Sequence, residues 1–280
     1  MPRIVMRRLD GSEAISPNER QLMDVLDPAS PAVTIMPARR APRILGFWGT
    51  TLWGAVIFAA LFAGQIAVVA YFVLGQSGSI DVAAAIRVVG KGLTISLSVI
   101  MGLPAVLLAL WLVIRATRTP FADYLGLRGF SAKYFLIGVV GLVIIIVGWD
   151  LMSRAVGHEV EPGFMLDVLK SAQNDGALWL LITAFCVAAP VSEELFARGF
   201  LYRGWSESFL GVAGAIILSS LVWTGLHMQY DWYFFGEIFS LGLWFGYLRY
   251  RSHSTWLTIV LHGLNNFGAV VQGIYLAGHS

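Results

Sequence analysis

The chain has 280 residues, of which 57% are hydrophobic and 13% are charged, and its formal net charge is +2. Soluble domains carry about 25% charged residues, so this composition argues against a soluble protein. The net charge is too small to suggest a nucleic-acid partner. We therefore expect an integral membrane protein surrounded by lipid. The single cysteine, Cys186, lies in an apolar run and is expected to pack there.

Residues 1–44 differ from the rest of the chain, because they are polar, contain prolines and carry charges of both signs. This composition predicts a mostly disordered cytoplasmic extension, with a short helix near 18–26 as an option. The first apolar run starts too late and is too long for a cleaved signal peptide. The predicted organisation is thus the extension 1–44 followed by a transmembrane helical domain at 45–280.

A helix that crosses a bilayer needs about 20 mostly apolar residues. Seven stretches of the chain are candidates, so the expected fold class is all-α, a polytopic membrane helical bundle with about seven transmembrane helices. The loop 153–176 is expected to hold a short amphipathic helix around Phe164–Ser171. The seven predicted spans lie near 46–74, 92–114, 134–152, 177–202, 209–227, 232–250 and 255–277.

The basic residues predict how the bundle is oriented in the cell membrane. With the N-terminus in the cytoplasm, the inner segments carry eleven Lys and Arg residues and the outer segments carry four. Cytoplasmic loops are enriched in these residues, so a cytoplasmic N-terminus is expected. The four outer residues are Arg87, Lys91, Arg154 and Lys170.

Two adjacent glutamates and an arginine stand near the polar end of the fourth predicted span. Residues four apart share a face of a helix, so Glu194 and Arg198 are expected to pair. Glu193 lies about 100° around the helix axis and is left as a free carboxylate. The alternative is a pair of interfacial glutamates with Arg198 and Arg203 as cytoplasmic anchors, and the spacing alone does not separate the two interpretations.

Polar side chains also occur in two later spans. His227 closes the fifth predicted span, and Trp223 lies one turn earlier on the same face. His262 and Asn266 share one side of the seventh predicted span, while Asn265 points off that side. The structural alternatives to a functional site are an interfacial histidine and a polar clasp between helices.

These polar sites on three different spans favour one shared cavity, since ionisable side chains inside a membrane are costly and usually mark function. Such a set can carry out hydrolysis. We expect Glu193 to act as a general base toward water and His227 to orient the same water. His262 and Asn266 are expected to donate hydrogen bonds to a developing oxyanion.

The same residues carry a resemblance to a known family. EELFAR (193–198) matches an EExxxR signature, WTGLH (223–227) matches FxxxH with Trp in place of Phe, and HGLNN (262–266) matches HxxxN. In order and placement these motifs resemble the CPBP family of intramembrane proteases. That family includes the type II CAAX prenyl endopeptidases and bacterial relatives linked to bacteriocin processing and self-immunity. The resemblance covers about residues 177–277, the expected catalytic core.

The resemblance implies an all-helical bundle that acts as a glutamate-dependent endopeptidase. Its substrate would be a membrane-associated peptide or protein, with a prenylated CAAX-type substrate as one option. The catalytic residues that it implies are Glu193, His227, His262 and Asn266, with Glu194, Arg198 and Trp223 in support.

Family members are often described as metalloproteases, which raises the option of zinc. A catalytic zinc site needs three protein ligands and an open position. Glu193, His227 and His262 are the candidate ligands, but the chain has no HExxH pair. A mechanism without a metal cofactor is therefore favoured, with zinc as the alternative.

Two other function classes fit the same residues. One is a catalytically silent membrane scaffold or bacteriocin self-immunity protein that binds a partner peptide in the same cavity. The other is a small transporter with Glu193 as a proton-coupled carboxylate. The lack of matching half-repeats in the sequence disfavours the transporter.

Overall fold

Helices and no strands make up the part of the chain that the computed structural model describes, which confirms the all-α fold class. The described residues all belong to one compact unit, Pro42–Ser280. The predicted extension 1–44, with its optional helix near 18–26, lies outside them apart from Ile44. The described residues are 44–75, 82–158, 163–228, 230 and 232–277.

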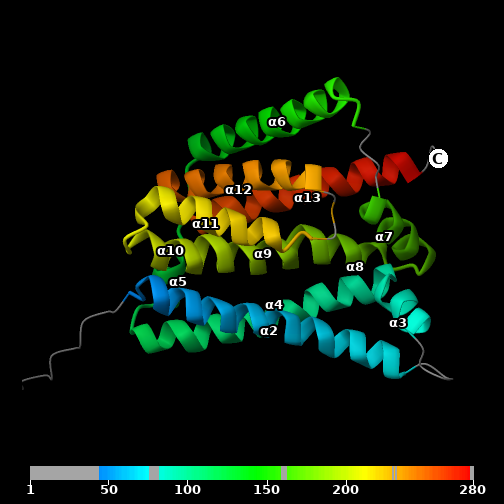
Figure 1. The fold of residues 1–280 in the computed structure, drawn as a ribbon, viewed down its shortest axis with the longest axis horizontal. Coiled ribbons are helices and arrows are strands. Elements are labelled where there is room, and N and C mark those ends of the chain that lie inside the picture. The colour runs from blue at the N-terminus through cyan, green and yellow to red at the C-terminus, as the bar shows by residue number, and fades with distance from the viewer. Residues whose placement is uncertain (1–43, 76–81, 159–162, 229, 231, 278–280) are drawn as a thin grey trace, which may run out of the picture. The chain divides into compact units, whose positions relative to one another are not determined.

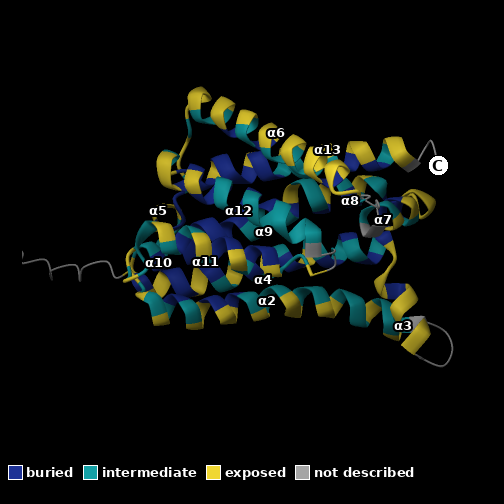
Figure 2. Ribbon diagram, turned by 45° about the horizontal axis from the view of Figure 1, so that its top comes forward, coloured by how far each residue is buried: buried dark blue, intermediate teal, exposed yellow. Residues whose placement is uncertain are grey.

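The first two predicted spans form a closely packed pair, α2 (Phe47–Leu74) and α4 (Gly92–Thr117). The two helices lie side by side (Figure 1). Gly64 of α2 permits this approach, because a Cβ atom there would lie 2.8 Å from the carbonyl oxygen of Met101 in α4. The outer face of α2 carries exposed apolar side chains, which suits a surface that contacts lipid (Figure 2).

Three shorter helices lie outside the predicted spans. The helix α7 (Gly163–Asn174) confirms the helix expected around Phe164–Ser171. The other two, α3 (Val82–Val89) and α5 (Phe121–Leu125), are not among the predicted elements, because eight and five residues are far too few for a span. Gly126 ends α5 in the left-handed backbone region, with a φ of 66°.

The fourth predicted span is one helical stretch, Leu178–Ser206, in which two π-helical segments interrupt the α-helix. Of its most apolar window, 50% is buried, against 6% for α2 and 11% for α6 (Ala132–Ala155), so this stretch is the central helix of the bundle. Its parts are α8 (Leu178–Thr183), η1 (Ala184–Ala188), α9 (Ala189–Glu194), η2 (Leu195–Leu201) and α10 (Tyr202–Ser206).

The last three predicted spans correspond to α11 (Gly211–Gly225), α12 (Trp232–Ser252) and α13 (Thr255–Ala277), which pack against the central helix (Figure 1). Within the described ranges, five helical stretches are long and apolar enough to cross a membrane, namely α2, α4, α6, the central helix and α13. The helix α11 is shorter, with 15 residues, and α12 is not among the five although it has 21 residues. The polytopic bundle is thus confirmed, while α11 and α12 do not meet the length and composition of a typical span.

The contact at Gly64 can be tested by adding one methyl group. We expect Gly64→Ala to lower the free energy of unfolding by about 1–3 kcal/mol, because the new Cβ atom would press on a backbone oxygen that cannot rotate away. Thermal unfolding in detergent, followed by circular dichroism, measures the change. Gly148→Ala in α6 is the matched control, since nothing lies within 4 Å of its Cβ position. Equal melting temperatures for the two variants would contradict the close packing.

Candidate active site

Three ionisable side chains meet inside the bundle. Nη1 of Arg198 donates to Oε1 of Glu194 at 2.9 Å, and Nδ1 of His262 lies 3.1 Å from the same oxygen. The side chains of Glu194 and Arg198 are fully buried, and that of His262 is 2% exposed. The predicted Glu194–Arg198 pair is confirmed, and His262 of α13 joins it as a third member. Below, these three residues are called the buried ion cluster.

Arg198 connects the buried ion cluster to two further helices. Its Nη2 donates to the carbonyl oxygen of Gly242 in α12 at 3.2 Å. Its Cζ atom lies 4.4 Å from the ring centroid of Trp223 in α11, so the cation contacts the face of the indole. One buried side chain of the central helix therefore contacts both α11 and α12.

Glu193 lies beside the buried ion cluster and makes different contacts. The indole Nε1–H of Trp223 donates to Oε2 of Glu193 at 2.7 Å, and Nε2 of His227 lies 3.9 Å from the same oxygen. The Glu193 side chain is 18% exposed, whereas that of Glu194 is fully buried. The two neighbouring glutamates thus differ as their helical faces predict, since Glu194 pairs with Arg198 and Glu193 does not.

The main chain sets the proton position on His227. Nδ1 of its ring lies 3.0 Å from the carbonyl oxygen of Trp223. A carbonyl oxygen only accepts, so Nδ1 carries the proton and Nε2 of the neutral ring presents its lone pair toward Glu193. The ring of Trp223 packs edge-on against His227 with centroids 5.0 Å apart, which confirms the expected contact between these two side chains.

Asn266 is bonded to a carbonyl group that the π-helical segment η1 leaves without a helical partner. The N–H of Ala189 donates to the carbonyl of Ala184, five residues back. The next N–H in this pattern, for the carbonyl of Phe185, would belong to Pro190, which has none. Nδ2 of Asn266 donates to the Phe185 carbonyl at 2.8 Å instead. A proline in the central helix and an amide in α13 therefore form one corner of the site.

Tyr230 also contacts the site, although the sequence analysis does not single it out. It lies between α11 and α12, outside the predicted spans, and its ring stacks on His227 with centroids 6.2 Å apart. Burial, followed by the negative charge of Glu193, raises the pKa of Tyr230 to about 12. The hydroxyl is therefore protonated at neutral pH. Its position three residues after His227 is the feature of the sequence that could have indicated this contact.

The zinc alternative requires Glu193, His227 and His262 to act together as ligands. Nδ1 of His262 faces Glu194, and the described part of the chain contains no group of three His, Cys, Asp or Glu side chains that could hold a metal ion. In this arrangement Glu193, His227 and His262 do not form one ligand group among the described residues.

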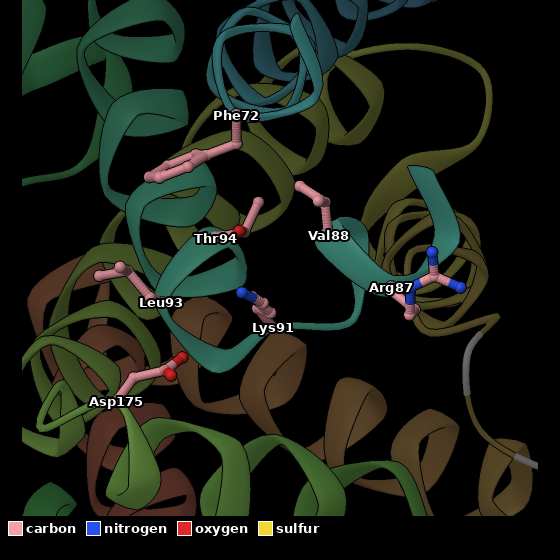
Figure 3. Close-up of a pocket in the computed structure, with 7 residues that line it drawn as sticks. All are labelled: Phe72, Arg87, Val88, Lys91, Leu93, Thr94 and Asp175. Atoms are coloured by element: carbon pink, nitrogen blue, oxygen red, sulfur yellow. The ribbon is translucent and has the colours of Figure 1, made fainter. Parts of the chain in front are cut away.

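A cavity of about 540 Å³ lies elsewhere in the bundle, lined by residues of α2, α3 and α4 together with Asp175 (Figure 3). Arg87 and Lys91 supply its basic groups, and Phe72 is part of its apolar lining. None of the predicted site residues lines this cavity. It is therefore separate from the candidate active site.

Fold and site together define a class, namely a polytopic helical membrane protein with a partly exposed glutamate beside a buried ion cluster. Residues 175–268 match the family described as Type II CAAX prenyl endopeptidase Rce1-like. This segment runs from the start of the central helix into α13 and contains all seven predicted site residues. The match confirms the resemblance to intramembrane proteases for this part of the chain and supports a peptidase, hence a hydrolase, in a lipid environment.

A curated relative shares a longer segment. The UPF0177 protein YbdI of Lactococcus lactis subsp. lactis (strain IL1403) is 26% identical over 155 residues. The alignment covers 55% of this chain and 78% of the relative. No solved structure gives a significant match to the chain.

The buried ion cluster predicts a strong dependence of stability on Arg198. We expect Arg198→Met to lower the free energy of unfolding by about 3–5 kcal/mol, because Glu194 would be left as a buried charge without its main partner. Thermal unfolding in detergent measures the loss. The double variant Glu194→Gln with Arg198→Met is expected to recover part of it, since the orphaned charge is then removed. Additive losses in the double variant would contradict a coupled pair.

Proposed function

We propose that this protein is an intramembrane endopeptidase that hydrolyses a peptide bond of a membrane-associated substrate, with Glu193 as the general base toward water. The observation that carries the proposal is the position of Glu193, which lies partly exposed beside Nε2 of His227 while its neighbour Glu194 is neutralised in the interior. A carboxylate that is accessible, and not paired with a cation, can accept a proton.

The spacing between Glu193 and His227 suits a shared water molecule. The 3.9 Å between Oε2 and Nε2 is too long for a direct hydrogen bond, and both atoms are acceptors when the imidazole is neutral. A water that donates one hydrogen bond to each would point an oxygen lone pair away from them. In the proposed step, this oxygen attacks the scissile carbonyl carbon while Glu193 takes the proton. Glu193 later returns that proton to the leaving amine nitrogen.

The proposed oxyanion donors are Asn266 and His262. Asn266 uses Nδ2 to donate to the Phe185 carbonyl, and an amide nitrogen carries a second N–H for an oxyanion. Nδ1 of His262 faces the Glu194 carboxylate, which only accepts, so Nδ1 carries a proton. His262 therefore donates from Nε2 only as an imidazolium. Such donors stabilise the negative charge of the tetrahedral intermediate.

The substrate class follows from the surroundings of the site and from the family match. Glu193 lies in a helix that is long and apolar enough to cross the membrane, so the scissile bond must reach the bundle from the lipid phase or its boundary. The description of the matching family favours a prenylated CAAX-type peptide as the narrower option. The proposal places the protein in the cell membrane with its N-terminus in the cytoplasm, on the strength of the basic residues in the inner segments.

The proposal predicts that Glu193→Gln abolishes cleavage without preventing insertion and folding, because the amide keeps the size of the side chain but cannot take a proton. The measurement is a proteomic comparison of membrane-protein termini in cells that produce the wild type or the variant. Termini that are present only with the wild type identify the substrate. Glu207→Gln is the matched control, since Glu207 pairs with Arg203 at the surface and its loss should leave these termini unchanged.

The same experiment separates the endopeptidase from a silent scaffold or self-immunity protein. A scaffold binds through shape and polarity, so Glu193→Gln would leave the cellular phenotype intact and change no termini. If wild type and Glu193→Gln cells show the same termini and the same phenotype, the endopeptidase proposal is wrong.

A further inference from the structure

Trp223 makes more contacts with the predicted site residues than its place in a sequence motif suggests. Its indole N–H donates to Oε2 of Glu193 at 2.7 Å, and its main-chain carbonyl accepts from Nδ1 of His227 at 3.0 Å. Its ring also meets His262 edge-on at 5.2 Å between centroids and lies under the guanidinium of Arg198. Trp223 is 2% exposed, whereas the side chains of Glu193 and His227 are 18% and 17% exposed, so Trp223 lies between the interior and the accessible part of the site.

The chemistry of the indole distinguishes Trp223 from the phenylalanine of the FxxxH pattern. A benzyl ring can fill the space beside His227, but it has no N–H to donate. The indole has one donor and no acceptor, so the group that it bonds must be an acceptor. The carboxylate of Glu193 is such an acceptor, and a hydrogen bond to it fixes the direction in which the carboxylate points.

We infer that Trp223 is a positioning residue, whose indole N–H and main-chain carbonyl hold the carboxylate of Glu193 and the ring of His227 toward each other. The inference rests on the proposed function, because it assigns a task to Trp223 in the reaction of Glu193. The hydrogen bond uses one lone pair of Oε2 and fixes the plane of the Glu193 carboxylate. The remaining lone pairs of that carboxylate therefore have a defined direction. The main-chain carbonyl of Trp223 fixes the ring of His227 at the same time. One residue therefore orients both Glu193 and His227, the two groups proposed to bind the attacking water.

The kinetic test compares the wild type with Trp223→Phe in proteoliposomes. The probe is an internally quenched farnesylated peptide with a C-terminal CAAX box. We expect kcat of Trp223→Phe to fall roughly 10-fold while KM stays close to the wild-type value, because the substrate still binds but Glu193 is no longer held in one geometry.

Trp244→Phe is the matched control for this series. It also removes an indole hydrogen bond, from Nε1 to the carbonyl of Gly138 at 3.1 Å, but that bond joins α12 to α6 and does not involve Glu193. We expect its kcat and KM to match the wild type. A role of Trp223 in packing alone would lower the melting temperature of Trp223→Phe and leave the kcat of the folded protein unchanged, and that result would overturn the inference.

A second measurement does not depend on cleavage. In the spectrum of the ¹⁵N-labelled protein in detergent, the indole N–H signal of Trp223 is the one of ten tryptophan signals that disappears in Trp223→Phe. We expect this signal to move in Glu193→Ala, which removes the acceptor, and to keep its position in Glu207→Ala, which alters a surface glutamate. A Trp223 signal at the same position in the wild type and in Glu193→Ala would overturn the inference.

The two measurements keep the inference apart from the proposed function. If the wild type does not cleave the probe, the indole signal still decides whether Trp223 bonds Glu193. If the wild type cleaves the probe and Trp223→Phe keeps the wild-type kcat, the positioning role is wrong while the endopeptidase stands.

Discussion

The arrangement of the last four long helical elements depends on the hydrogen bonds of Glu194 and Arg198. Inside a membrane there is little hydrophobic driving force between helices, so close packing and polar contacts determine how they associate. The buried ion cluster provides such contacts from one turn of the central helix, with Glu194 bonded to α13 and Arg198 to α12 and to the ring of Trp223 in α11. A buried ion pair adds little net stability, but breaking it is costly, so it specifies one register of these helices over others.

The buried ion cluster also makes it possible for two adjacent glutamates to coexist in the central helix. Two carboxylates close together normally resist ionising at the same time. Here Arg198 neutralises Glu194 in the interior and His262 lies within hydrogen-bond distance of it, while Glu193 faces away from them toward Trp223 and His227. An accessible base and a structural anion can therefore occupy consecutive positions of one helix.

Pro190 places a second constraint on the site, through the backbone. An unsatisfied carbonyl inside a bilayer costs several kcal/mol. The π-helical segment before Pro190 leaves the Phe185 carbonyl without a main-chain donor, and the side chain of Asn266 donates to it instead. Gly263, one turn earlier in α13, has no Cβ atom, and one there would lie 2.7 Å from the carbonyl of Cys186. This close approach of α13 to the irregular part of the central helix fixes the position of Asn266 relative to Glu193.

The sequence by itself determined the helical class, the limits of the long apolar helices and the pairing of Glu194 with Arg198. Apolar run length and the spacing of four residues are local properties, and a helix converts them directly into structure. It also led to the difference between Glu193 and Glu194, since their side chains project from different sides of the helix. The sequence overestimated α11 and α12 as spans, because α11 has only 15 residues and α12, although 21 residues long, is less apolar than the five long helices.

Only the tertiary structure decided which partners these groups have on other helices. It brought His262 to Glu194, the indole of Trp223 to Glu193, and Asn266 to a main-chain carbonyl. The physical reason is that carbonyl groups carry no sequence signal. In addition, the π-helical segments shift the helical phase by an amount that residue spacing does not encode. Contacts between residues 30 to 81 positions apart depend on how whole helices pack, which no local pattern specifies.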